Sequence, residues 1–518
     1  MSTNVAASER EFELKPSEKL TQKAYLNVIA SLLDYFAKIA VGLLLTPILV
    51  AGLGRSLFGV WEMLSRLVGY MSVTDGRPTE ALRLIISNQQ ALDDPASKRR
   101  YVGSAFAVWI LFLPILATAG TILVWLSPTI AKVSPESHMT VRLTTALLVV
   151  NFVLANFAAL PESVLRGMNL GYKRMGLQAG LNLIGGLITA KAIYIGSGLA
   201  GIAGAQLMLT CLAGILFWFV VKKYVAWFGF AKPGRADVMQ VLGLSIWNTA
   251  GNLIAKLHLA SDVIILGVIT SASTVTTYVL TGYAAQAVTG IVTLNVIAVT
   301  PGFAGLIGGK EYDKTATLRE EMMVMNWLLV TAIGSTILLW NRSFIHLWVG
   351  ENYYAGSWAN LLIVLVMAQT TFIRSDASLI DATLRLRERV LIGGVAALFS
   401  IGLGILLTPS LGIVGLCVGL LTGRLAQTAS YPFIVNSFLR KSQQHGLRRA
   451  VRSGLVMVLC FACSTYLSMW FIARSWLEWL ACVPTTFALM LLIAFATGLS
   501  ADSRTSVIRR LRQIRLSN

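Results

Sequence analysis

Long apolar segments alternate with short polar ones along almost the whole chain. Because an α-helix rises ~1.5 Å per residue, about 20 apolar residues are enough to cross the hydrocarbon core of a bilayer. The pattern predicts fourteen membrane-spanning helices, at residues 25–51, 57–75, 102–126, 143–165, 175–196, 198–221, 239–269, 273–300, 322–340, 357–373, 390–408, 411–437, 453–472 and 477–499. The segments between them are too short to form a separate catalytic domain. We therefore expect an all-α polytopic membrane protein.

Two apolar segments that lie 218 residues apart have similar sequences. LNVIASLLDYFAKI (residues 26–39) aligns with LSIWNTAGNLIAKL (residues 244–257), which places Lys38 on Lys256 and Asp34 on Asn252. A spacing of six helices keeps the same direction across the membrane, so the pair indicates a parallel repeat. We expect two pseudo-symmetric six-helix lobes and two further helices, arranged as a cytoplasmic N-terminal tail at 1–24, an N-lobe at 25–221, a C-lobe at 239–437, helices 13 and 14 at 453–499, and a basic cytoplasmic tail at 500–518.

The composition and the distribution of charge agree with this topology. The chain is 56% hydrophobic and 13% charged, with a mean hydropathy of +0.70. If the N-terminus is cytoplasmic, 33 of the 43 Lys and Arg residues fall on the cytoplasmic side and only five on the outside. Positive residues concentrate on the cytoplasmic side of membrane proteins, so both termini are expected there. The net charge of +19 thus reflects topology and does not indicate nucleic-acid binding.

The two tails suggest how the protein is targeted and held. The first 23 residues are polar and show no cleavage-site pattern, so we expect the first span itself to direct insertion. The C-terminal tail carries four apolar residues on one helical face beside arginines, namely Val507, Ile508, Leu511 and Ile514. This pattern is typical of a helix lying on anionic phospholipids, although the arginines can equally serve only to orient the chain.

Charged residues inside the predicted spans are the main candidates for function. Basic residues lie near mid-membrane at Lys38, Arg66, Lys256 and Arg424, and Lys191 lies nearer the outside; the acidic ones are Asp34, Glu62 and Asp262. A charge at the bilayer centre costs at least ~2.5 kcal/mol, and such residues usually face a partner or a watery path. The surplus of cations favours a path for an anion, and the three acids are candidates for coupling to H⁺ or Na⁺.

A purely structural alternative exists for the same residues. Asp34 and Lys38 are four apart on one helix, as are Glu62 and Arg66, so the four could form a neutral quartet that only pins the first two spans together. Neither a metal site nor a cofactor is expected. The five cysteines, Cys211, Cys417, Cys460, Cys463 and Cys482, lie in apolar runs, and the four histidines are scattered.

Three stretches carry a resemblance to a known family. TPILVAGLGRSLFGVWEMLSRLVGYMSVTDGRPTEALRLIISN (residues 46–88) resembles the opening of the Wzx-type oligosaccharide flippases, in the polysaccharide-transporter family of the multidrug/oligosaccharidyl-lipid/polysaccharide exporter superfamily. Residues 260–286 and 341–358 resemble later segments of that family. The family usually has a small or apolar residue after Asp75-Gly76, where this chain has Arg77. Asp75 and Arg77 are therefore candidates for a cytoplasmic gate that differs in detail from the gate of that family.

The resemblance implies a function as well as a fold. It implies two lobes around a cavity that opens alternately to either side, and a cargo of undecaprenyl-diphosphate-linked oligosaccharide moved to the outer leaflet of a bacterial cytoplasmic membrane for O-antigen, capsule or exopolysaccharide synthesis. It also implies a polymerase and a chain-length regulator of the same pathway as partners. Spans 13 and 14 could hold the lipid tail, as in the related lipid II flippases, or only pack.

Two other functions compete with this interpretation. A cation-coupled multidrug exporter of the same superfamily should carry excess carboxylates at its centre, whereas this chain carries excess cations. A membrane polysaccharide polymerase or glycosyltransferase needs a large outside loop, and the predicted outside loops are short. No nucleophile elbow or phosphate-binding P-loop motif occurs, so an enzymatic role is not expected.

Overall fold

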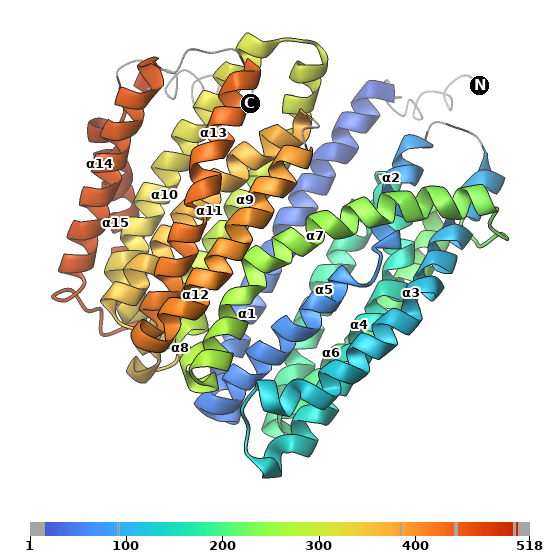
Figure 1. Cartoon of the computed structure of the whole chain (residues 1–518), viewed down its shortest axis with the longest axis horizontal. Helices are drawn as coiled ribbons and strands as arrows, with labels where there is room; N and C mark the ends of the chain where they lie inside the picture. Colours follow the sequence, from blue (N-terminus) through green and yellow to red (C-terminus); the bar gives the residue numbers. More distant parts are fainter. Residues whose placement is uncertain are drawn as a thin grey trace, which may run out of the picture. The chain divides into compact units, whose positions relative to one another are not determined.

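The computed structural model describes residues 16–90, 92, 94–383, 386–439, 444–500 and 504–505. Within these residues all regular structure is helical (Figure 1). The longer helices are α1 (Pro16–Tyr70), α2 (Pro78–Asn88), α3 (Pro95–Ile130), α4 (His138–Gly167), α5 (Tyr172–Tyr194), α6 (Gly198–Tyr224), α7 (Arg235–Ile269), α8 (Ala272–Thr281), α9 (Tyr283–Gly308), α10 (Tyr312–Trp348), α11 (Ser357–Ala382), α12 (Leu386–Gly423), α13 (Leu425–Leu439), α14 (Gln444–Leu467) and α15 (Trp476–Ile493). The first 15 residues and the apolar face predicted for the C-terminal tail lie outside the described residues.

Eight helical segments of the described chain are long and apolar enough to cross a membrane: Ile29–Val73, Pro95–Ile130, Pro135–Gly167, Gly198–Tyr224, Tyr312–Trp348, Ser357–Ala382, Arg387–Leu439 and Trp476–Gly498. The first contains 45 residues and the seventh 53, each about twice what one crossing of a bilayer needs. The expectation of a multi-pass all-helical membrane protein is confirmed, and the number of fourteen spans stays a prediction.

The chain divides into two compact units. Unit 1 comprises Met1–Thr46, Met71–Ile122 and Leu143–Ala250, and unit 2 comprises Pro47–Tyr70, Leu123–Arg142 and Gly251–Asn518. The first division falls inside α1. This element is two helices joined at Gly54, whose φ of 73° and ψ of 171° lie outside the helical region. A positive φ of this kind is readily adopted only by glycine.

In unit 1, short helix α2 anchors a compact core. Pro78 occupies its first turn, where a missing N–H is harmless, and Leu82, Ile85 and Ile86 are buried on one face. They belong to the same core cluster as Val102 of α3 and other residues of α4, α6 and α7. Burial of each such side chain contributes about 1.5–3 kcal/mol, which fixes α2 against the helices beside it.

Two adjacent glycines of α5 bring its neighbours close. A Cβ built on Gly185 would lie 2.5 Å from Leu209 Cδ1 of α6, and one built on Gly186 would lie 2.8 Å from Val41 Cγ1 of α1. Both distances are too short for real atoms. Small residues are favoured at helix contacts in membranes, because packing rather than the hydrophobic effect drives association there. The pair therefore holds α5 between the first part of α1 and α6.

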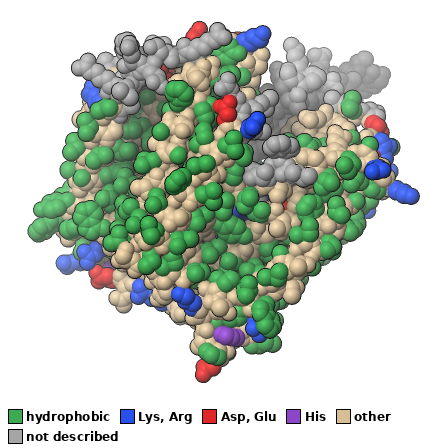
Figure 2. Space-filling view, viewed as in Figure 1, with side chains coloured by type: hydrophobic (Ala, Val, Ile, Leu, Met, Phe, Trp, Pro, Cys, Tyr) green, Lys and Arg blue, Asp and Glu red, His purple; other side chains and the backbone are tan. Residues whose placement is uncertain are grey.

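Unit 2 is built around α10 and α11, which are the most buried of the membrane-spanning segments. Helix α10 contacts α9, α11, α14 and α15, and α11 also contacts α12 and α13. On the face drawn in Figure 2, hydrophobic side chains cover the sides of the helices, while Lys and Arg side chains gather near helix ends. This distribution is expected for helices whose sides contact lipid and whose ends contact water.

Element α12 is also two helices, joined at Gly412 with φ 57° and ψ −130°. Its halves touch through small residues. A Cβ on Gly419 would lie 2.5 Å from the backbone nitrogen of Gly404, and one on Gly423 would lie 2.3 Å from that of Ser400. The spacing of four residues on each side forms a small-residue contact that lets the two backbones meet. Gly423 directly precedes Arg424, so this contact also sets the position of Arg424.

Candidate functional site

In unit 1, Asp34 and Lys38 form an ion pair on α1. Lys38 Nζ lies 2.9 Å from Asp34 Oδ2, and Asn182 of α5 donates a hydrogen bond of 2.9 Å to Asp34 Oδ1. The Asp34 side chain is 18% exposed, and that of Lys38 is 56% exposed. Both carboxylate oxygens are thus occupied, while the ammonium group keeps N–H donors that other groups can use.

A chain of polar side chains connects this pair to the first turn of α5. Gln178 donates to Asn182 Oδ1 over 3.1 Å, and Arg174 donates to Gln178 Oε1 over 3.4 Å. Arg174 also pairs with Glu162 of α4 at 2.7 Å. The three α5 residues are spaced by four, which places them on one face of the helix. A continuous polar path therefore runs along α5 from its first turn to Asp34.

A cavity of about 370 Å³ lies beside this path, among α1, α5 and α6. Its lining combines Lys38 with uncharged polar residues and small or apolar ones: Val41, Gly42, Gln178, Leu181, Asn182, Gly185, Thr189, Gln206, Leu209, Thr210 and Ala213. The cavity has the size of small-molecule sites, which measure ~300–1,000 Å³. Lys38, one of the predicted substrate-binding residues, is therefore at a cavity.

In unit 2, Arg424 is buried and held by uncharged groups. Its Nη1 donates to the Thr370 hydroxyl of α11 over 2.7 Å, and its Nη2 donates to the His258 carbonyl oxygen of α7 over 2.7 Å. Its Nε is buried and has no hydrogen-bond partner among the described residues. An arginine in this setting is oriented without being neutralised by a direct ion pair.

Arg374 is a second cation in the interior of unit 2 that the sequence analysis missed. The hydropathy pattern ended the tenth span at residue 373 and left Arg374 in a cytoplasmic segment. The structure instead continues α11 to Ala382, and Arg374 donates to the hydroxyl of Thr293 on α9. Arg374 also interacts electrostatically with Arg424. The residues that follow, Ser375 to Ile380, are buried in the continued helix.

The acidic residues of unit 2 lie near these cations. Asp262 accepts hydrogen bonds of 2.8 Å from the Tyr278 hydroxyl and from the backbone N–H of Val263. Glu62 interacts with the charges of Arg66 and Asp262, and Asp262 interacts with Arg424. The candidates Glu62, Asp262 and Arg66 therefore belong to one charged group.

The other two candidate cations lie in different surroundings. A Cβ built on Gly69 of α1 would lie 3.6 Å from Lys256 Nζ, and Tyr70 donates to the Lys256 carbonyl oxygen over 3.1 Å. Lys191 is exposed in the last turn of α5 and does not line the cavity of unit 1. The hypothesis that Asp34, Lys38, Glu62 and Arg66 form a neutral quartet stays a prediction. Asp34 interacts with Lys38 and Asn182 in unit 1, and Glu62 interacts with Arg66 and Asp262 in unit 2.

The candidate gate residues Asp75 and Arg77 form the turn that begins α2. Asp75 is buried, and its Oδ1 accepts a 3.0 Å hydrogen bond from the backbone N–H of Arg77. Arg77 has a φ of 44° and a ψ of 46°, a left-handed conformation that usually favours glycine. A side chain on Gly76 would collide with the Phe112 ring at 2.7 Å. The turn is therefore sterically constrained.

Glu80, three residues further on, is surrounded by arginines. It pairs with Arg83 at 2.8 Å and with Arg166 of α4 at 3.7 Å. Burial alone would raise the pKa of Glu80, but the hydrogen bond from Arg83 and the charges of Arg83, Arg166 and Arg77 outweigh it and lower the pKa below its ordinary value. Glu80 thus stays ionised and ties α2 to α4.

The arrangement of helices is similar to that of known transporters. The lipid II flippase MurJ, in an inward closed conformation, has a TM-score of 0.63 at 11% identity, over 90% of this chain and 98% of that one. An inward-facing multidrug resistance MATE family transporter of the MOP superfamily has a TM-score of 0.61 at 12% identity, over 81% and 99%. The Vibrio cholerae MATE transporter VcmN has a TM-score of 0.56 at 14% identity, over 82% and 98%. No curated protein sequence matches the chain.

These likenesses show the fold: a multi-pass helical membrane protein with the helix arrangement of these transporters. A family model described as polysaccharide biosynthesis protein matches residues 25–307, which is more than half of the chain. The protein therefore belongs to this family of polysaccharide biosynthesis proteins, and its fold is the one seen in the transporters named above.

Proposed function

We propose that the protein moves an undecaprenyl-diphosphate-linked oligosaccharide from the inner to the outer leaflet of the bacterial cytoplasmic membrane by alternating access. The cargo supplies O-antigen, capsule or exopolysaccharide synthesis. Family membership supports a role in polysaccharide biosynthesis. The solved structure of a lipid II flippase with a similar fold supports a lipid-linked cargo.

The observation that carries the proposal is the state of Arg424 and Arg374. In the part of the chain that the structure describes, the hydrogen bonds of both guanidinium groups go to hydroxyl or carbonyl oxygens, and none goes to a carboxylate. A diphosphate offers several oxygens that accept two parallel charge-assisted bonds from an arginine. Moving negative charge outward is also favoured by the membrane potential, by ~2.3 kcal/mol per charge per 100 mV.

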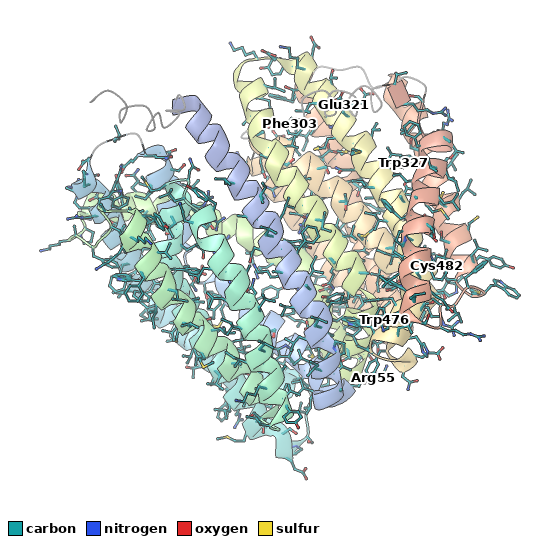
Figure 3. The ribbon with its side chains drawn as sticks, turned by 180° about the vertical axis from the view of Figure 1, so that it is seen from behind. Arg55, Phe303, Glu321, Trp327, Trp476 and Cys482 are labelled. Atoms are coloured by element: carbon teal, nitrogen blue, oxygen red, sulfur yellow. The ribbon has the colours of Figure 1, made fainter. Side chains whose placement is uncertain are left out.

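The proposed topology has fourteen spans with both termini cytoplasmic. The two helices joined at Gly54 supply two crossings, and α12, which bends at Gly412, supplies two more together with α13. Helices α5, α7, α9 and α14 have lengths of 23, 35, 26 and 24 residues. Each is longer than the ~20 residues that a crossing needs. Figure 3 shows Arg55 and Trp476, both expected outside, near one end of unit 2, and Phe303 and Glu321 near the opposite end.

Transport can be tested in proteoliposomes that contain the purified protein and a fluorescent undecaprenyl-diphosphate-linked oligosaccharide. Appearance of the glycan on the far leaflet, detected by a membrane-impermeant glycosidase, should depend on the protein. Replacing Arg374 or Arg424 by Met should reduce the rate about tenfold or more, because each charge-assisted hydrogen bond contributes ~1.5–3 kcal/mol. Equal exposure of the glycan in protein-free and protein-containing vesicles would refute the proposal.

Multidrug export is the competing function. Its transported cations need a carboxylate whose charge is not already paired, but Asp34 forms an ion pair with Lys38. Ethidium efflux from cells that express the protein should therefore equal that of cells with the empty vector. Efflux that is lost in Asp34→Asn would favour the exporter instead.

A further inference from the structure

The cavity of unit 1 combines polar with apolar lining residues and carries little net charge. Among the described residues that line it, Lys38 alone is formally charged, and its ammonium group is paired with Asp34 at 2.9 Å. The remaining polar lining consists of amides and hydroxyls, at Gln178, Asn182, Thr189, Gln206 and Thr210. Amide and hydroxyl groups in a membrane-spanning region cost free energy unless they are hydrogen-bonded, so this lining needs partners.

Three of these side chains have their hydrogen-bonding groups available. The side chains of Gln178 and Asn182 form hydrogen bonds in the polar chain along α5. Among the described residues, the side chains of Thr189, Gln206 and Thr210 form no hydrogen bond. Thr189 is only 6% exposed. Other threonines of this unit donate to the carbonyl four residues earlier, as Thr121 does to Ala117 at 2.9 Å. The hydroxyls of Thr189 and Thr210 make no such bond and are left for a ligand in the cavity.

The charge balance selects among ligands. A phosphate needs a cation whose hydrogen bonds do not go to a carboxylate, which is the setting of Arg424 in unit 2 and not that of Lys38. A cationic ligand needs a carboxylate whose charge is not already paired, and Asp34 is paired with Lys38 at 2.9 Å. An uncharged polyhydroxylated ring matches donors and acceptors that are themselves uncharged, and the remaining N–H groups of Lys38 can donate to its hydroxyl oxygens.

We propose that this cavity binds sugar residues of the cargo through Thr189, Gln206, Thr210 and Lys38, separately from the site that holds the diphosphate. The volume of about 370 Å³ suits one or two sugar rings within the ~300–1,000 Å³ range of small-molecule sites. Recognition of the sugar in unit 1 makes the selectivity for the glycan independent of the attraction for phosphate. This inference rests on the proposed function and deepens it by assigning the sugar-binding side chains.

Two lipids distinguish the two sites: undecaprenyl diphosphate without sugar, and the undecaprenyl-diphosphate-linked oligosaccharide extracted from cells that lack the transporter. Binding of each to the purified full-length protein is measured by microscale thermophoresis in detergent. The double variant Gln206→Leu, Thr210→Val should bind the glycan-bearing lipid about tenfold more weakly, since each lost neutral hydrogen bond costs about two- to tenfold. Its affinity for undecaprenyl diphosphate should be unchanged. Thr121→Val is the matched control and should bind both lipids as the wild type does.

A second measurement keeps the test independent of the lipid. Mild acid hydrolysis releases the free oligosaccharide, which should raise the melting temperature of the wild type and of Arg424→Met, but not that of Thr189→Val or of the double variant. If the double variant bound both lipids equally more weakly, or bound both as the wild type does, the sugar site would be overturned while the proposed flippase function would stand. A wild type that binds neither lipid nor free oligosaccharide would overturn both proposals.

Discussion

The guanidinium group of Arg424, at the junction of α12 and α13, donates a 2.7 Å hydrogen bond to the hydroxyl group of Thr370 on α11. A second bond of 2.7 Å fixes Arg424 to the His258 carbonyl oxygen. Both partners are uncharged, so they orient the guanidinium plane while its positive charge stays available for an anion. Under the proposed function, this arrangement distinguishes a cation that binds the diphosphate from one that forms an ion pair.

Substitutions at these two positions should affect transport more than stability. Arg424→Lys keeps the charge but loses the planar fork, so the flipping rate should fall about tenfold. Thr370→Val removes one orienting hydrogen bond of ~0.5–1.5 kcal/mol and should reduce the rate about two- to tenfold. The control Thr422→Val removes a hydroxyl that donates only within its own helix, to Val418. Rates are measured in proteoliposomes, and wild-type rates in Arg424→Lys would contradict the assignment.

The interaction of Asp34 with Asn182 should appear as a coupling in stability. Asp34→Ala leaves the Asn182 amide without its acceptor, which should cost about 1–3 kcal/mol. Adding Asn182→Leu removes the orphaned amide, so the double variant should be more stable than the sum of the single changes predicts. The ionic contribution of Lys38 should be small, since this side chain is more than half exposed. Detergent thermal unfolding measures all members of the cycle, and strict additivity would argue against the contact.

Gly423 should tolerate no side chain, because an added Cβ would lie 2.3 Å from the Ser400 backbone nitrogen. Gly423→Ala should lower the free energy of unfolding by about 1–3 kcal/mol, the usual effect of overpacking, and should also displace Arg424. Gly402 in the same element is the matched control, since nothing lies within 4 Å of its Cβ position. Gly402→Ala should be neutral or stabilising by about 0.5–1 kcal/mol. Equal melting temperatures for the two variants would count against the packing of α12.

The pKa of Glu80 predicts an acid-sensitive contact between α2 and α4. Its pKa is lower in the folded protein than the ordinary value of 4.5, because the surrounding arginines outweigh the effect of burial. The ionised form therefore stabilises the fold above pH 4.5, and this contribution is lost as pH falls through the lower folded-state pKa. Glu80→Gln should have a lower melting temperature than the wild type at neutral pH, and the difference should shrink in acid. The control variant is Glu136→Gln, at an exposed position in the segment before α4, measured at the same pH values.

The topology can be read by cysteine labelling in a variant without the five native cysteines. Cysteines at Glu136 and Asn352 should react with an impermeant maleimide in intact cells, because the positive-inside distribution places these exposed residues outside. Cysteines at Ala96 and Lys232 should react only after permeabilisation. Labelling of position 96 in intact cells would contradict the predicted fourteen-span topology.

The sequence by itself determined that the protein is a helical multi-pass membrane protein, and it determined the depth of several charges. Both follow from local properties. A bilayer requires apolar runs of a certain length, and a rise of ~1.5 Å per residue converts position in such a run into depth. Lys38 and Arg424 could be identified in this way. The resemblance of residues 46–88 also indicated the family that the comparison with residues 25–307 confirmed.

Only the tertiary structure decided which groups meet. Asp34 contacts Asn182, 148 residues away, and Arg424 contacts His258 and Thr370, because the rotation of each helix about its axis sets its neighbours. In lipid, the outer and inner faces of a helix are both apolar, so hydropathy does not reveal that rotation. Arg374 was missed for a related reason: a charged residue near the end of an apolar run has the same pattern whether the helix stops there or continues. Close packing at Gly185, Gly186 and Gly423 fixes these rotations. Such packing depends on the shapes of both contacting helices, which one segment of sequence does not reveal.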